Sequence, residues 1–127
     1  MSDSAAAPPP ADTRPPINEQ WLTRMRTTKP EFLAKLFEVF LEDEPKRITM
    51  LGQAVCDGKL DMVRFLAHSI KGAAATLGME RLCDASRVLE HAARDNGQAD
   101  ELARQYAVVL GEMEKVFDVM RAENPTA

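Results

Sequence analysis

Four long stretches of this 127-residue chain repeat apolar residues at intervals of three and four, the spacing of a helix with one buried face. The clearest stretch is the last, with apolar positions Leu102, Tyr106, Val109, Met113, Val116 and Met120. Helix-ending residues separate the stretches at Gly58, Gly78 and Asn96-Gly97. Connections this short force neighbouring helices to run antiparallel. The pattern predicts an all-α fold, an antiparallel up-and-down four-helix bundle.

The ends of the chain are expected to lie outside this bundle. Residues 1–16 contain five prolines and several alanines, a composition typical of a disordered tail. Asn18 is placed to cap a short helix whose Trp21 covers the end of the bundle. We therefore expect a Pro/Ala-rich tail at 1–16, the domain at 17–123 and a disordered end at 124–127.

The second helix carries two local signals. The residues TKPE at 28–31 match a capping box, in which the Thr28 hydroxyl and the Glu31 side chain each satisfy a free backbone amide. Pro45 lies within the same apolar pattern and predicts a kink or a short break near residues 41–44.

Composition excludes several classes of function. The sequence has no basic segment followed by an apolar run and no apolar stretch long enough to span a membrane, so we expect a soluble cytoplasmic protein. A formal net charge of −4 argues against nucleic acid as a partner and favours a protein. Cys56 and Cys83 are far apart and are expected to be small core residues, with no disulfide or zinc site.

The most informative residue is His68, within the segment AHSIKGAAATLG at residues 67–78. At about 100° per residue, His68 lies about 140° from the apolar seam of its helix and points to solvent. Side chains three and four positions later cover the adjoining surface, so Lys71 can reach the imidazole and Gly72 leaves it accessible. Glycine costs a helix about 1 kcal/mol relative to alanine, which suggests a reason other than helix stability.

This arrangement suits the transfer of a small anionic group. A histidine ring is largely neutral and nucleophilic at neutral pH, and it can form covalent intermediates. A phosphoryl group that moves between two acceptors needs positioning and charge stabilisation from the protein. Lys71 and Gly72 supply charge and space, so the segment predicts a phosphoryl carrier. His91 lacks such neighbours and is expected to be an ordinary surface or partly buried residue.

The segment at 67–78 resembles the signature of histidine-containing phosphotransfer (HPt) domains. The shared features are an alanine-histidine pair, an aliphatic residue, a lysine-glycine pair and the further glycine Gly78. The likeness extends to Leu82, Leu89 and Glu90 on the next helix. It implies the four-helix bundle predicted above.

The resemblance also implies roles for individual residues. His68 would be the phosphorylated residue, Lys71 the cation that faces the phosphate, and Gly72 the clearance for a partner. The implied partners are receiver domains of response regulators and a hybrid sensor histidine kinase, and phosphate would pass between an aspartate of one receiver and an aspartate of another. Magnesium is expected in the receiver and no cofactor in this chain.

Five further residues surround the predicted site. Glu90 either supports the second imidazole nitrogen, as a polar residue does in some HPt domains, or is ordinary surface. Arg64 and Arg94 either add positive potential or, as we favour, are solvated surface. Phe65, about 200° from the seam, either belongs to a docking patch or packs on a neighbouring helix. Ala75 is a small residue about 120° from the seam, on the exposed face.

Two other functions are weighed against the carrier. The sequence has no glycine-rich phosphate loop and no kinase motif, so we expect no ATP site and no kinase activity. A non-phosphorylated adaptor that binds receivers or kinases would have no chemical reason to keep His68, Lys71 and Gly72 together. A metal-binding bundle needs convergent glutamate and histidine ligands on facing helices, but the sequence has only two histidines and no Glu-x-x-His pair. Because the bundle closes its own core, we expect a monomer.

Overall fold

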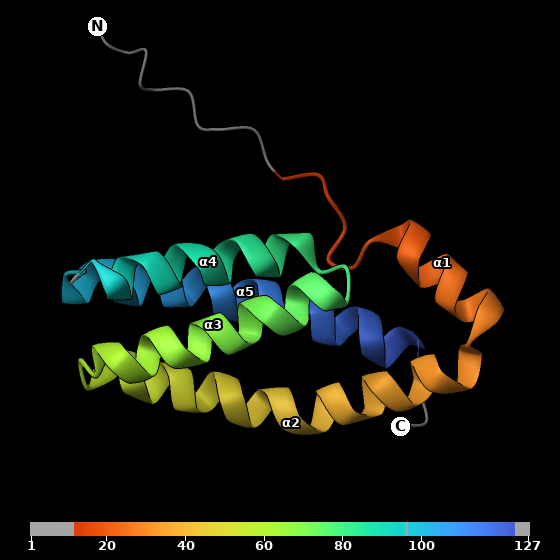
Figure 1. Cartoon of the computed structure of the whole chain (residues 1–127), viewed down its shortest axis with the longest axis horizontal. Helices are drawn as coiled ribbons and strands as arrows, with labels where there is room; N and C mark the ends of the chain where they lie inside the picture. The colour runs from red at the N-terminus through yellow and green to blue at the C-terminus, as the bar shows by residue number, and fades with distance from the viewer. Residues whose placement is uncertain (1–11, 96, 124–127) are drawn as a thin grey trace, which may run out of the picture.

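The computed structural model describes residues 12–95 and 97–123, and these residues form five helices and no strand. The predicted all-α class is therefore confirmed. The helices are α1 (Glu19–Thr28), α2 (Pro30–Cys56), α3 (Leu60–Thr76), α4 (Glu80–Arg94) and α5 (Ala99–Glu123). Figure 1 shows α2 to α5 lying lengthwise beside one another, with α1 at one end.

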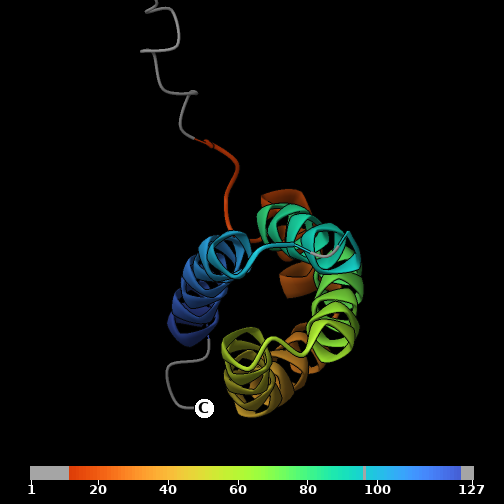
Figure 2. The same ribbon diagram turned by 90° about the vertical axis from the view of Figure 1, so that its left-hand side faces the viewer.

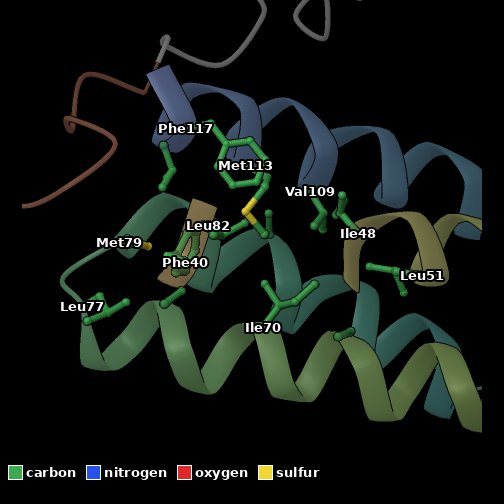
Figure 3. Packing of buried hydrophobic residues seen from close by; sticks show 14 of the residues in the cluster. Phe40, Ile48, Leu51, Ile70, Leu77, Met79, Leu82, Val109, Met113 and Phe117 are labelled. Carbon is green, nitrogen blue, oxygen red and sulfur yellow. The ribbon is translucent and has the colours of Figure 1, made fainter. Parts of the chain in front are cut away.

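Helices α2 to α5 surround one apolar core. Each packs on its neighbour in chain order, and α5 returns to α2, which closes the ring seen end-on in Figure 2. Residues from all four helices meet in the centre (Figure 3), and the fully buried ones include Phe37, Leu51, Val63, Ile70, Leu82, Leu89, Val109 and Met113. The apolar seams predicted from the sequence thus face one another.

Contacts between α2 and α5 show that these two helices run in opposite directions. Phe40, early in α2, meets Phe117, late in α5, with ring centroids 6.1 Å apart. Farther along α2, the Tyr106 hydroxyl of α5 donates a hydrogen bond to the carbonyl of Ile48 at 3.1 Å. Gly52 makes room for this tyrosine, because a Cβ at residue 52 would lie 2.6 Å from its hydroxyl oxygen.

Helix α1 is attached to the turn between α3 and α4. The Asn18 side chain accepts a hydrogen bond from the Trp21 amide at 2.9 Å, as predicted for an N-cap. The Asn18 amide donates to the carbonyl of Gly78 at 2.7 Å. Gly78 has φ +71°, and a Cβ there would lie 3.2 Å from the Cβ of Asn18. Gly78 thus allows both the turn and the close approach of α1.

The predicted capping box at 28–31 is wrong. Thr28 is the last residue of α1, and its hydroxyl donates to the Arg24 carbonyl at 2.7 Å instead of capping the next helix. Lys29 is the N-cap of α2 and makes no side-chain capping bond. The capping box fails because α1 continues to the residue that would have been the cap.

Two other expectations need correction. Helix α2 passes through Pro45 without interruption, so the alternative of a break is wrong; its packing on both α3 and α5 keeps the helix continuous across the lost amide. Cys56 is exposed and Cys83 half-buried, so Cys56 is not a core residue. It is the last residue of α2, one position beyond the half-buried Val55.

The expected tail reaches farther into the fold than the sequence suggests. Residues 12–16 lie against α4, where the Arg14 guanidinium forms a 2.9 Å ion pair with Asp84. Ile17 follows with only 2% of its surface exposed. Residues 1–11 and 124–127, and Asn96 of the predicted terminator, lie outside the described residues.

Candidate functional site

The structure places His68 on the exposed side of α3. Its helical neighbours Ala67 and Ile70 are buried in the core, whereas the His68 side chain is 65% exposed. The buried seam follows from the alternation of apolar and polar residues along α3. The imidazole is therefore accessible to another molecule.

Glu90 of α4 contacts this imidazole. Its Oε2 lies 2.9 Å from Nδ1 of His68, and the Glu90 side chain is only 15% exposed. Because α3 and α4 pack side by side, a residue 22 positions later in the chain meets the ring. An ionised carboxylate can only accept a hydrogen bond, so Nδ1 donates and the lone pair is left on Nε2.

The same carboxylate also binds Lys71. The ammonium nitrogen of Lys71 lies 2.7 Å from Oε1 of Glu90, and the Lys71 side chain is 26% exposed. Burial acts to raise the pKa of Glu90, but the hydrogen bonds from Lys71 and His68 outweigh it and hold that pKa below its ordinary value. Glu90 therefore remains ionised between two donors.

The spacing along α3 predicts only that the Lys71 ammonium can swing over the imidazole, and it does not determine which way the side chain points. In the structure Lys71 points toward α4 and shares Glu90 with the ring. The Glu90 carboxylate is largely shielded from water, so it attracts the nearby ammonium strongly, which explains the direction of the Lys71 side chain.

Beyond the imidazole the surface of α3 is open. Gly72 is exposed, and a Cβ built there would meet no atom within 4 Å among the described residues. Ala75, also exposed, borders a groove of about 310 Å³ between α3 and α4. Met79, Cys83 and Arg14 also line this groove.

Phe65 is exposed one helical turn before His68. Its exposed fraction is 65%, so the alternative in which it packs on a neighbouring helix is wrong. Met62, on the preceding turn of α3, is 43% exposed. Exposed apolar side chains beside an accessible nucleophile are typical of a protein-binding surface.

Comparison with known proteins identifies the family. The family model described as "Hpt domain" matches residues 35–123, more than half of the sequence. The chain belongs to the Hpt domain family. Among solved structures, it resembles histidine-containing phosphotransfer protein B (HptB) of Pseudomonas aeruginosa PAO1, with 23% identity, a TM-score of 0.73 and coverage of 89% of this chain and 97% of that one. A search of curated proteins returns no match.

Membership of the Hpt family supports a role in histidine phosphotransfer within phosphorelays. The likeness to HptB concerns the fold, which here carries the segment at 67–78 on α3. The family match begins at residue 35, so α1 and residues 12–18 lie outside the matched region.

The two arginines that were predicted near His68 pair with carboxylates close to them in the sequence. Arg64 binds Asp61 at 3.3 Å and Arg94 binds Asp95 at 3.5 Å. Their side chains are about half exposed, at 47% and 54%, and among the described residues neither arginine forms an ion pair with His68. Arg87 of α4, which the sequence did not single out, is 51% exposed and binds Asp84 at 3.4 Å.

The other histidine, His91, is half-buried on α4. Within residues 12–95 and 97–123, no group of three or more His, Cys, Asp or Glu side chains could hold a metal ion. In the same ranges no helix is long and apolar enough to cross a membrane.

Proposed function

We propose that this Hpt protein is a phosphoryl carrier in which Nε2 of His68 accepts a phosphoryl group from the phospho-aspartate of one receiver domain and passes it to the aspartate of another. The observation that carries the proposal is an exposed imidazole whose Nδ1 lies 2.9 Å from a largely buried carboxylate. In this proposal the scaffold that carries His68 is an antiparallel up-and-down four-helix bundle, with α1 as a cap at one end.

The transfer step follows from the tautomer that Glu90 favours. The lone pair of Nε2 attacks phosphorus, the bond between phosphorus and the aspartyl oxygen breaks, and the aspartate leaves as a carboxylate. Nδ1 keeps its proton, so positive charge develops on the ring. The Glu90 carboxylate stabilises that charge through its hydrogen bond.

Lys71 and Gly72 serve the same step in different ways. The Lys71 ammonium is within reach of a group on His68, because residues three apart on a helix are neighbours. Gly72 leaves open space beside the imidazole, where a side chain would meet an approaching partner. In-line transfer needs such an approach.

The partner is a receiver domain, which would bring its own acidic pocket and Mg²⁺. Phe65 and Met62 on one side of His68, and Ala75 on the other, form the proposed docking surface. A hybrid sensor histidine kinase is the proposed source of phosphate, and the protein acts as a monomer without an ATP site.

The experiment is label transfer from a radiolabelled phospho-receiver to the wild type, His68→Gln and His91→Gln. We expect label on the wild type and on His91→Gln and none on His68→Gln. Label on His68→Gln, or none on the wild type when a control carrier accepts it, would contradict the proposal. A receiver that binds wild type and His68→Gln equally while transferring no label would indicate the adaptor.

A further inference from the structure

One carboxylate serves two donors in this site. Glu90 Oε1 binds the Lys71 ammonium at 2.7 Å, and Glu90 Oε2 binds Nδ1 of His68 at 2.9 Å. When the imidazole ring is neutral, Lys71 supplies the positive charge that balances the Glu90 carboxylate. The lysine assigned to the phosphoryl group is therefore already engaged before any phosphoryl group arrives.

Phosphorylation changes the charges of both neighbours of Glu90. When the Nε2–phosphorus bond forms and Nδ1 keeps its proton, the ring becomes a cation hydrogen-bonded to Glu90. A phosphoryl group with several anionic oxygens then stands on the opposite side of the same ring. Glu90 gains a second cation, and Lys71 gains a second anion.

Lys71 can change partners without a movement of the backbone. It lies one helical turn from His68, and its flexible four-carbon stem allows the ammonium to rotate. Glu90 has less freedom, because its side chain is 15% exposed between α3 and α4. When the partners change, we therefore expect the Lys71 side chain to move and the Glu90 side chain to stay in place.

We propose that Lys71 exchanges Glu90 for the phosphoryl group when His68 is phosphorylated, so that Glu90 is a positioning residue that competes with phosphate for the ammonium. The physiological use of this exchange rests on the proposed function, but the competition itself is a property of the site. It makes the phosphoryl group less tightly held than a free lysine would hold it. A carrier that must release its cargo benefits from such competition.

The test uses a small phosphoryl donor, so that it does not depend on a receiver. Phosphoramidate transfers its phosphoryl group to the imidazole as its own nitrogen–phosphorus bond breaks and ammonia leaves. All variants carry His91→Gln, which leaves His68 as the one histidine to label. The readout is the midpoint of the phosphoryl titration followed by ³¹P NMR, because a nearby ammonium favours the more highly charged phosphate and lowers that midpoint.

Four proteins complete the comparison: the parent, Lys71→Met, Glu90→Gln and the double variant. Lys71→Met is expected to raise the midpoint by about half a pH unit when Glu90 is present, and by more in the Glu90→Gln background, where nothing competes for the lysine. Glutamine keeps an oxygen that can accept from Nδ1. Lys115→Met on α5 is the control and is expected to leave the midpoint unchanged.

Two results would overturn the exchange. A midpoint that is unchanged by Lys71→Met when Glu90 is present would show that the lysine stays on Glu90 after phosphorylation. An equal effect in both backgrounds would mean that Glu90 does not compete. Failure of receivers to phosphorylate His68 would instead contradict the proposed function and leave this comparison intact.

Discussion

Arg81 of α4 and Glu112 of α5 form an ion pair with 2.9 Å between Nη2 and Oε2, and each side chain is only 14% exposed. Nη1 of the same arginine donates to the backbone carbonyls of Asp12 and Arg14, both at 3.0 Å. One arginine thus joins the last two helices to the segment that precedes α1. This segment lies outside the region matched by the family model.

Arg81→Met is expected to lower the free energy of unfolding by about 3 kcal/mol, because it leaves the largely buried Glu112 carboxylate with only the ammonium of Lys115, 3.8 Å away, as a cationic partner. Urea denaturation measures the loss. Arg81→Met combined with Glu112→Leu removes both charges and is expected to recover most of the stability. If the double variant is no more stable than Arg81→Met, the loss comes from the missing hydrogen bonds of Arg81 to Asp12 and Arg14, and not from the Glu112 carboxylate.

Glu44 is expected to make the protein less stable as the pH rises. Its side chain lies in the core with 4% of the residue exposed, and its Oε1 makes no hydrogen bond among the described residues. Burial raises the pKa of Glu44, although Arg47 at 2.6 Å partly offsets this. A carboxyl whose pKa is higher in the folded state favours folding below its unfolded pKa. That contribution is lost as the pH rises through the folded value.

The measurement is the free energy of unfolding of wild type and Glu44→Gln across the acidic to neutral range. The wild type should lose stability relative to Glu44→Gln as the pH increases, with the difference constant once Glu44 is ionised. Glu42→Gln, an exposed neighbour on α2, controls for the loss of a surface carboxylate. A difference that shrinks with rising pH would contradict the raised pKa.

Gly72→Ala is expected to stabilise the protein and slow phosphotransfer. The added methyl group meets no atom within 4 Å among the described residues, so the helix should gain about 0.5–1 kcal/mol. The same methyl group stands beside His68, where a receiver must approach. Gly111→Ala on α5 is a matched control, since its Cβ also has open space. Both variants should gain similar stability, and only Gly72→Ala should transfer phosphate more slowly. Equal transfer rates in the two variants would show that Gly72 does not provide clearance for a partner.

The sequence predicted the exposed position of His68 on its helix better than the contacts of the site. His68, Lys71 and Gly72 could be found because their spacing along one helix determines which of them share a face. The Glu90 contacts depend on the register between α3 and α4, and the ion pair between Arg81 and Glu112 depends on the register between α4 and α5. No periodicity within a single helix contains that information. The same limit explains Lys71, whose direction was set by a carboxylate on another helix.

The fold shows a similar division. The four apolar seams predicted the bundle, because burial of one face per helix leaves few other arrangements. Local signals at the helix ends were less reliable. The capping pattern at 28–31 was overridden by the extension of α1, and the proline at 45 was accommodated within α2. Residues 12–16 have the composition of a tail but are held by ionic contacts of Arg14 and Arg81.

Phe65→Ala is expected to weaken the interaction with a receiver by about tenfold and to change the free energy of unfolding by no more than about 0.5 kcal/mol. The residue is 65% exposed one turn from His68, so its removal deprives the core of little packing while removing an aromatic contact from the docking surface. Binding to an unphosphorylated receiver, measured by calorimetry, gives the affinity apart from the chemistry. Phe32→Ala, which removes a 55% exposed phenylalanine from the first turn of α2, is the control and should bind as the wild type does. An equal loss of affinity in both variants would indicate a general effect of exposed apolar side chains. No loss of affinity in either variant would show that Phe65 is not part of the docking surface.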